Sequence, residues 1–167
     1  MSCDSPRQID DQTPENLCKT IISRTIWTPG ELVLEPARGD GNFYRHLPKT
    51  VKKDWCEIKQ GRDFFRYWKH VDTIITNPPF RNQQGGVNLF IPFLEHSLEV
   101  AKNRVIILIN HKCFNSCKPN RLHKYERYGW VMTDLAIYSI KKWSGLYFLL
   151  TFGQGGKRAV EWDERAY

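Results

Sequence analysis

The chain of 167 residues carries a formal net charge of +7, a pI of about 9.2 and 41% hydrophobic residues. It contains no signal peptide, no apolar run long enough to span a membrane and no disulfide-framework spacing among its five cysteines, so one globular domain in the cytoplasm is expected. The positive charge favours a polyanionic partner, although it also serves ordinary solubility.

The first half of the chain is predicted to alternate helices and strands. Residues 1–11 are polar and are expected to be loose, and Thr13-Pro14-Glu15 predicts a helix start with the Thr13 hydroxyl as its cap. Apolar spacing and turn residues predict the elements that follow. They are a helix through Ile22, a strand at 31–35, a glycine turn at 36–43, a helix through Leu47, a strand at 54–58 and a strand at 71–76.

The second half of the chain continues the alternation of helices and strands and then ends in two consecutive strands. Its predicted elements are a helix at 87–101, a buried strand at 104–110, a basic helix at 118–128, and strands at 131–140 and 146–152. Alternation predicts an α/β fold, a mostly parallel sheet with helices on both faces. No helix separates the last two strands, so the final strand is expected to be antiparallel. The folded domain is expected at 12–153, followed by a flexible tail at 154–167.

The most informative motif is Asn77-Pro78-Pro79-Phe80, which directly follows the apolar strand at 71–76. The end of a buried parallel strand is where open α/β sheets bind their ligands. The proline pair predicts a rigid turn with outward carbonyl groups, and the residue before it is pushed into an extended conformation that projects the Asn77 amide. Phe80 adds a ring on which a planar base can stack. Two oxygen acceptors beside a ring suit a planar group that bears an amine.

A glycine turn connects the first predicted strand to its helix. Gly39 and Gly41 allow the backbone to turn tightly and to approach a ligand closely. Tyr44 occupies the third glycine position of a dinucleotide-binding loop, so a pyrophosphate cofactor is less favoured than a cationic sulfonium nucleoside. Glu35, at the end of the strand, can bind an ammonium group or a ribose hydroxyl.

Taken in order, these motifs resemble those of the S-adenosylmethionine (SAM) dependent N6-adenine methyltransferases. Asn77-Pro78-Pro79-Phe80 is similar to their catalytic motif. The glycine turn is similar to their first cofactor motif, with Glu35 in place of the usual aspartate and Arg38 where a small residue is common. The resemblance runs from about Gln12 to Phe152. It implies a Rossmann-like class I methyltransferase fold, SAM as cofactor, and methyl transfer to the N6 amino group of adenine in nucleic acid, with DNA favoured over RNA.

The resemblance also implies roles for other residues. Glu57 matches the ribose-binding carboxylate, Asp63 the acid at the cofactor's adenine amino group, and Phe64 the ring against that adenine. The implied cofactor-binding set is Thr13, Pro14, Glu35, Pro36, Ala37, Gly39, Gly41, Phe43, Glu57, Asp63 and Phe64. Because few residues separate Glu57 from Asp63, the helix that normally follows the second strand of this family is expected to be missing.

The basic second half offers candidates for nucleic-acid contact. Phosphate contacts position a substrate but read no sequence, and the chain has no room for a DNA-reading domain, so a partner subunit is a candidate for sequence recognition. The candidate phosphate-binding residues are Lys112, Lys118, Arg121, Lys124 and Arg127.

Cys113 and Cys117 lie near His111 and His123 in the sequence, which raises the question of a zinc site. The paired Cys-x-x-Cys spacing of structural zinc sites is missing, so no metal is expected.

Other functions stay open from the sequence. The same tetrapeptide occurs in ribosomal-RNA enzymes that methylate adenine N6 or guanine N2, and the small size of the chain favours them. Protein glutamine methyltransferases usually carry tyrosine in place of Phe80. A non-catalytic nucleic-acid-binding subunit with the same fold is an alternative of another class, although the intact Asn77-Pro78-Pro79-Phe80 motif argues against it.

Overall fold

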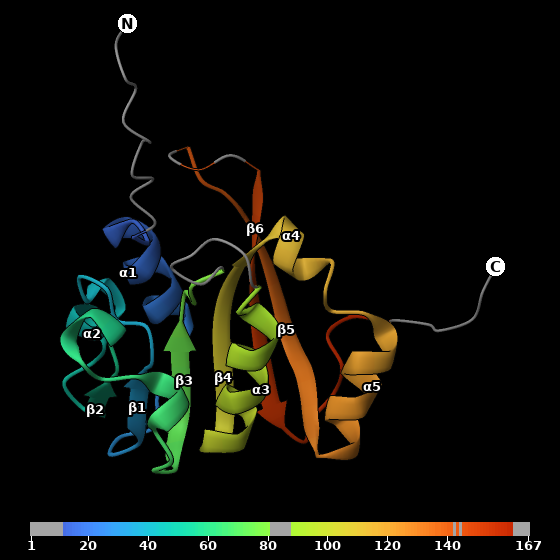
Figure 1. Ribbon diagram of the computed structural model, residues 1–167, viewed down its shortest axis with the longest axis horizontal. Coiled ribbons are helices and arrows are strands. Elements are labelled where there is room, and N and C mark those ends of the chain that lie inside the picture. The colour runs from blue at the N-terminus through green and yellow to red at the C-terminus, as the bar shows by residue number, and fades with distance from the viewer. Residues whose placement is uncertain (1–11, 81–87, 142, 144, 162–167) are drawn as a thin grey trace, which may run out of the picture.

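The computed structural model describes residues 12–80, 88–141, 143 and 145–161. Its sheet has six strands in the order β2-β1-β3-β4-β6-β5 (Figure 1). The strands are β1 (Leu32–Glu35), β2 (Lys52–Trp55), β3 (Val71–Thr76), β4 (Ala101–Asn110), β5 (Trp130–Ser139) and β6 (Leu146–Gln154). The helices are α1 (Glu15–Arg24), α2 (Asn42–His46), α3 (Phe90–Val100), α4 (His111–Phe114) and α5 (Pro119–Arg127), with short 3-10 helices η1 (Ile58–Gln60) and η2 (Phe64–Arg66).

Strand directions confirm the predicted fold class. The pairs β1–β2, β1–β3 and β3–β4 are parallel, whereas β6 is antiparallel to both β4 and β5. The β3 bounds, Val71–Thr76, are those predicted from the sequence. Between β2 and β3 the chain forms only η1 and η2, which confirms that the usual helix is missing there.

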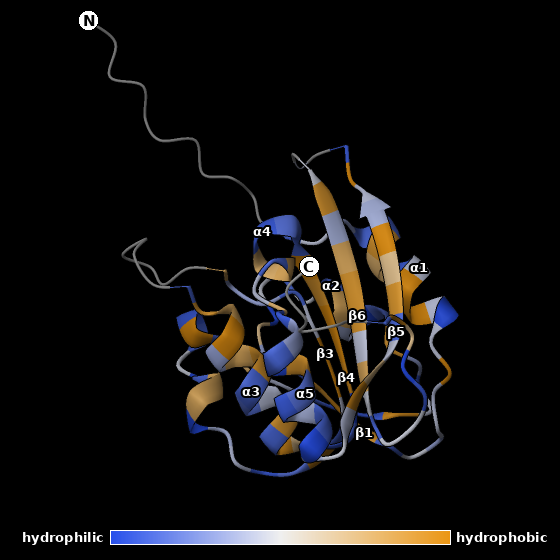
Figure 2. Cartoon of the chain, turned by 90° about the vertical axis from the view of Figure 1, so that its right-hand side faces the viewer, coloured by the Kyte–Doolittle hydropathy of each residue, from blue (hydrophilic) through white to orange (hydrophobic). Residues whose placement is uncertain are grey.

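Helices cover both faces of the sheet, and β4 lies at its centre (Figures 1 and 2). Val105, Ile107 and Ile109 face the layer under α3 and α5, whereas Ile106 and Leu108 face the layer under α1 and α2. All five side chains are at most 2% exposed, which explains why β4 reads as a continuous apolar run. In the described part of the chain, no helix is both long and apolar enough to cross a membrane.

The position of β2 differs from the prediction of a strand at 54–58. β2 begins at Lys52, because Lys52 and Lys53 pair with Leu32 and Val33 of β1. It ends at Trp55, and Glu57 caps η1 with its side chain instead of continuing the strand. As an edge strand, β2 can leave charged side chains in solvent, so an apolar pattern could not locate it.

The start of α1 also differs from the prediction. Pro14, and not Thr13, is the N-cap residue, and no side chain caps this helix. The Thr13 carbonyl instead accepts a hydrogen bond of 2.7 Å from Asn42 Nδ2. Thr13 therefore fastens the N-terminal segment to α2 through its backbone.

The predicted helix at 87–101 corresponds to α3, Phe90–Val100, and its predicted start at Val87 lies outside the described residues. Pro92 lies in the first turn, where a missing N–H costs nothing. Ala101, predicted as the helix end, is the first residue of β4.

The segment after β6 returns to the sheet. Arg158 forms two hydrogen bonds of 2.6 Å with the Glu126 carboxylate of α5, and Ala159 N–H donates to the Met132 carbonyl of β5 at 2.9 Å. The domain limit at residue 153 and the flexibility of the tail beyond it stay predictions.

A buried charge network lies at the amino ends of β1 and β3, the end of the sheet opposite Asn77. Glu31 is 9% exposed, and its carboxylate accepts hydrogen bonds of 2.8 Å from Thr28 N–H and from the Thr73 hydroxyl. Arg104 lies 3.5 Å from the same carboxylate. Removal of one partner of such a network leaves the others buried without it.

We therefore expect Glu31→Ala to lower the free energy of unfolding by about 2–3 kcal/mol in urea denaturation. The matched control is Lys102→Ala, an exposed residue of β4, which should change stability by less than about 0.5 kcal/mol. A loss no larger than that of the control would show that the network contributes little. Ligand affinity should be unchanged, because the network is far from the strand ends that carry the motifs.

Candidate functional site

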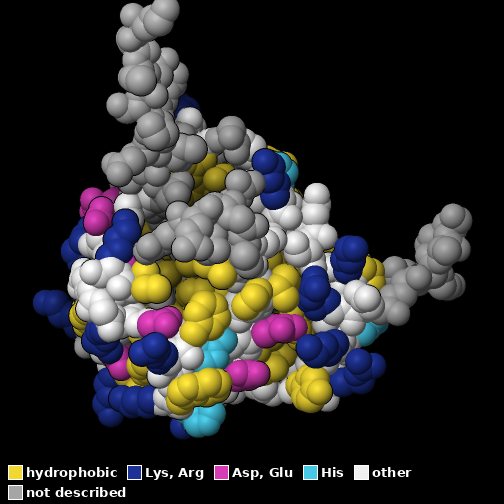
Figure 3. All heavy atoms as spheres, in the orientation of Figure 1, with side chains coloured by type: hydrophobic (Ala, Val, Ile, Leu, Met, Phe, Trp, Pro, Cys, Tyr) yellow, Lys and Arg dark blue, Asp and Glu magenta, His cyan; other side chains and the backbone are white. Residues whose placement is uncertain are grey.

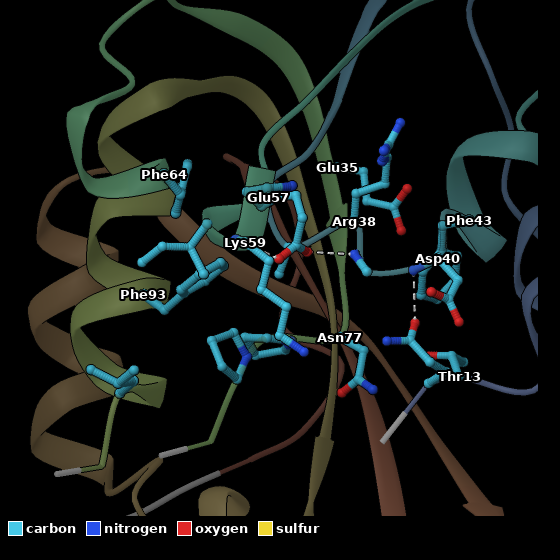
Figure 4. Close-up of a pocket in the computed structure, with 18 of the residues that line it drawn as sticks. Thr13, Glu35, Arg38, Asp40, Phe43, Glu57, Lys59, Phe64, Asn77 and Phe93 are labelled. Carbon is cyan, nitrogen blue, oxygen red and sulfur yellow. Dashed lines mark hydrogen bonds between the residues drawn. The ribbon is translucent and has the colours of Figure 1, made fainter. Parts of the chain in front are cut away.

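A cleft of about 460 Å³ opens at the carboxyl ends of β1, β2 and β3. The glycine turn after β1, the segment after β2, the Asn77 turn after β3 and the start of α3 form its walls (Figure 4). Most of the residues predicted as catalytic or cofactor-binding line it. They are Thr13, Glu35, Pro36, Ala37, Gly39, Phe43, Glu57, Asp63, Phe64, Asn77, Pro78, Pro79 and Phe80.

Two predicted cofactor-binding residues, Pro14 and Gly41, do not line the cleft but shape its walls. Pro14 starts α1. Gly41 starts α2 with a φ of +82°, and its N–H donates to the Arg38 carbonyl at 2.8 Å. This backbone conformation strains any residue with a Cβ atom, so Gly41 is needed for the turn itself.

Glu35 is the buried acid of the cleft, at the end of β1. Its side chain is 2% exposed, and its carboxylate accepts a hydrogen bond of 2.8 Å from Tyr44 N–H. Burial raises the pKa of Glu35 to about 8, although the hydrogen bond from Tyr44 opposes this shift. A cation that enters the cleft would favour the ionised form of this group.

Glu57 connects the two segments that follow β1 and β2. One carboxylate oxygen accepts from Gly39 N–H at 2.7 Å, and the other accepts from Lys59 N–H at 3.1 Å (Figure 4). The Asp63 carboxylate accepts from Phe65 N–H at 3.0 Å and so caps η2. Because each carboxylate oxygen has two acceptor positions, both groups keep capacity for ligand hydroxyl or amine hydrogens.

Gln12 contacts the glycine turn, although it was not among the predicted site residues. Its side-chain oxygen accepts a hydrogen bond of 3.1 Å from Asp40 N–H. A Cβ atom on Gly39 would lie 2.4 Å from that oxygen, and Gly39 has a φ of +51°. The glycine therefore makes room for the N-terminal segment as well as for a ligand.

Arg38, whose role the sequence left open, is stacked on β2. Its guanidinium lies 3.8 Å from the centre of the Trp55 ring and donates to Gln60 at 2.8 Å. Arg62 lies 4.2 Å from the centre of the same ring. The Arg38 side chain thus holds the wall of the cleft to the sheet edge.

The opposite wall of the cleft is apolar. Phe64 and Phe93 lie with ring centres 4.6 Å apart, and Leu89 N–H donates to the Phe80 carbonyl at 3.2 Å. Leu89 and Phe93 line the cleft but were missed from the sequence. No local motif marks them, because the packing of α3 against η2 and the Asn77 turn brings them there. One half of the cleft is thus acidic and the other suits planar apolar groups.

The predicted nucleic-acid residues are spread over two elements. Lys112 lies on α4, which follows β4 at the cleft end of the sheet, and Lys118 precedes α5. Of those within α5, Lys124 lies 3.2 Å from Glu95, and Arg121 donates to the Ser116 carbonyl. The fifth residue, Arg127, ends α5. Figure 3 shows lysine and arginine side chains on both sides of a central apolar region, with acidic side chains between them. Their contact with nucleic acid stays a prediction.

Cys113 and Cys117, considered above for a zinc site, are thiols with raised pKa. Burial raises the pKa of Cys113 to about 11 and that of Cys117 to about 12, which disfavours the thiolate that binds metal. Within residues 12–80, 88–141, 143 and 145–161, no group of three or more histidine, cysteine and acidic side chains could hold a metal ion.

Comparison with solved structures identifies the fold. TrmN from Thermus thermophilus superposes with a TM-score of 0.56 at 16% identity, covering 84% of this chain and 48% of TrmN. A protein assigned as the modification subunit of a type I restriction enzyme from Vibrio vulnificus YJ016 gives a TM-score of 0.63 at 16% identity, covering 88% and 45%. Magnesium protoporphyrin IX methyltransferase ChlM from Synechocystis PCC 6803, solved with bound SAM, gives 0.61 at 12% identity, covering 84% and 79%.

The chain thus spans about half the length of the first two of these proteins. No protein-family model matches the chain, and no curated protein matches it. The structural likeness, together with the strand order, shows that the chain has the Rossmann-like fold of the class I methyltransferases.

Proposed function

We propose that the protein transfers a methyl group from SAM to the exocyclic N6 amino group of adenine in nucleic acid, with DNA as the favoured substrate. One observation carries this proposal: the Asn77-Pro78-Pro79-Phe80 turn and the acidic glycine turn line the same cleft. The two halves of the site come from separate strands, and the parallel sheet places them side by side.

The acidic half of the cleft fits a cationic sulfonium nucleoside. Glu35, Asp40, Glu57 and Asp63 line it together with Arg38 and Lys59, and its ionised carboxylates would attract a cationic ligand. Glu57 and Asp63 are available to ribose hydroxyls and an adenine amine, and the Phe64 ring can pack against the base. Bound SAM would supply a methyl group made electrophilic by the positive sulfur. The SAM found in ChlM, which has the same fold, supports this choice.

The end of the cleft at the Asn77 turn fits the substrate base. The N6 nitrogen of adenine is a poor nucleophile, because its lone pair is delocalised into the ring. The Asn77 side-chain oxygen and the Pro78 carbonyl would accept its two hydrogens and stabilise the positive charge that develops during attack. Phe80 would stack on a base flipped from its helix. Transfer would form the nitrogen–carbon bond while the carbon–sulfur bond breaks and leaves its electron pair on sulfur, and one N6 proton would then leave to water.

The positive charge of the chain and one structural neighbour favour a nucleic-acid substrate. The net charge of +7 suits a polyanion, and lysine and arginine side chains flank the apolar centre of the face in Figure 3. The likeness to a restriction-modification subunit supports DNA, and the name of that protein as a subunit supports a partner for sequence recognition. RNA adenine N6 or guanine N2 is the alternative substrate class.

Mass spectrometry of nucleosides tests the proposal. The protein is incubated with methyl-deuterated SAM and duplex DNA, single-stranded DNA or structured RNA, and the products are digested to nucleosides. Labelled N6-methyldeoxyadenosine is the expected product. Label found only in N6-methyladenosine or N2-methylguanosine would identify RNA, and not DNA, as the substrate. If no nucleoside carries label although calorimetry shows SAM binding, the proposed methyltransferase activity would be contradicted and a non-catalytic subunit would be supported.

A further inference from the structure

His96 is a buried histidine in the middle of α3, outside the cleft. Its side chain is 6% exposed. The ring lies edge-on to Phe64, with ring centres 4.6 Å apart at 62°, and edge-on to Trp68, at 4.6 Å and 83°. Both aromatic partners thus come from the segment that follows Asp63, which consists of η2 and the residues just after it.

The polar contacts of His96 are with the same segment. Nε2 lies 3.0 Å from the Phe64 carbonyl oxygen and 3.0 Å from the Tyr67 carbonyl oxygen. Carbonyl oxygens only accept, so Nε2 must carry the proton and share it between the two. The other ring nitrogen, Nδ1, faces the Glu99 carboxylate at 3.6 Å. One side chain of α3 therefore holds both ends of η2.

η2 carries the residues expected at the nucleobase end of the cofactor. Asp63 caps η2, and Phe64 is its first residue. About one turn before His96 on α3, Phe93 packs on the Phe64 ring, with ring centres 4.6 Å apart, and lines the cleft. A shift of η2 would move the Asp63 carboxylate and the Phe64 ring together, because Asp63 is the N-cap of η2 and Phe64 is its first residue. Contacts with Asp54 of β2 also hold the segment, through Arg62 at 2.8 Å and the Tyr67 hydroxyl at 2.9 Å.

We infer that His96 is a positioning residue that fixes Asp63 and Phe64 for binding of the cofactor's adenine. This inference rests on the proposed SAM site but not on the identity of the methylated substrate. It assigns to α3 a role in cofactor affinity, in addition to its packing on the sheet. Hydrogen bonds from Nε2–H carry that role, and the aromatic contacts of the ring are secondary to them.

Binding of 5′-methylthioadenosine, which carries the adenine end of the cofactor without its amino-acid end, tests the inference by calorimetry. His96→Leu keeps an apolar side chain of similar volume but loses the donor, and its affinity should fall by about tenfold. His96→Gln places an amide N–H at about the reach of Nε2 and should restore affinity to within about threefold of the unmodified protein. Leu98→Ala is the matched control, because Leu98 is buried on the same helix and its apolar side chain cannot donate a hydrogen bond to η2.

Leu98→Ala should lower thermal stability and leave affinity within about twofold. An equal loss of affinity in Leu98→Ala and His96→Leu, or no rescue by glutamine, would overturn the inference. If His96→Leu does not fold, nitrogen NMR of the unmodified protein decides, since a proton on Nδ1 in place of Nε2 would also overturn it. Absence of 5′-methylthioadenosine and SAM binding by the unmodified protein would instead refute the proposed cofactor, on which the inference depends.

Discussion

Replacing Asn77 with alanine is expected to lower methyl transfer by about a hundredfold or more while SAM affinity stays nearly unchanged. The Asn77 side chain lies at the wall of the cleft, after the last residue of β3, and across from the acidic glycine turn (Figure 4). Its oxygen would accept an amine hydrogen most strongly as positive charge develops on the nitrogen. Its loss should therefore slow the transfer and leave SAM binding nearly unchanged. Single-turnover transfer of tritiated methyl groups, together with calorimetry of SAM binding, measures the two effects separately.

Asn77→Asp is the matched control for this prediction. Aspartate keeps an oxygen acceptor at the same place, so part of the lost activity should return, whereas alanine removes it. Transfer by Asn77→Ala within about tenfold of the unmodified protein would contradict the assigned role. A large loss of SAM affinity in Asn77→Ala would instead place this residue in cofactor binding.

The candidate site could be predicted where local motifs follow strand ends. Glu35 ends β1 and Asn77 follows β3, and the carboxyl ends of neighbouring parallel strands meet at one edge of the sheet. A correct strand order is therefore enough to bring the two motifs together. The core strands β3 and β4 could also be located, for a different reason. Their residues are buried on both faces of the sheet, which leaves a strong hydrophobic signal in the sequence.

Contacts made by tertiary packing could not be read from the sequence. Phe93 and His96 act on the site through α3, and no spacing along the chain connects them to Phe64. Gln12 reaches the glycine turn from the N-terminal segment, and β2 has no apolar pattern because it is a charged edge strand. These features depend on which surfaces meet, which is decided by the whole fold.

Glu35→Gln is expected to stabilise the fold at alkaline pH. Burial raises the pKa of Glu35 to about 8 from an ordinary value of 4.5, so the folded protein favours the neutral acid. Below pH 4.5 the group is protonated in both folded and unfolded chains, and it costs no stability. The cost grows as the pH rises from 4.5 to about 8 and is then constant.

Glutamine stays neutral and can still accept the Tyr44 N–H bond, so it removes this cost. The expected gain in the free energy of unfolding is about 2 kcal/mol or more at pH 8, and close to zero at pH 4.5. Urea denaturation at the two pH values measures the difference. An equal gain at both would show that improved packing, and not the buried charge, is responsible.

The same substitution should weaken SAM binding, because a cation in the cleft favours ionised Glu35. At pH 7 this group is mostly protonated, so binding should release close to one proton, and the affinity contributed by Glu35 should rise until about pH 8. The ratio of SAM affinities of the unmodified and Glu35→Gln proteins cancels titration of the ligand's own α-amino group, whose pKa is about 7.7–8.0. 5′-Methylthioadenosine, which carries no positive charge, should give a ratio near one at every pH. A ratio for SAM that stays flat from pH 6 to 8 would show that Glu35 does not face the cationic part of the ligand, and its burial would then have to serve the glycine turn alone.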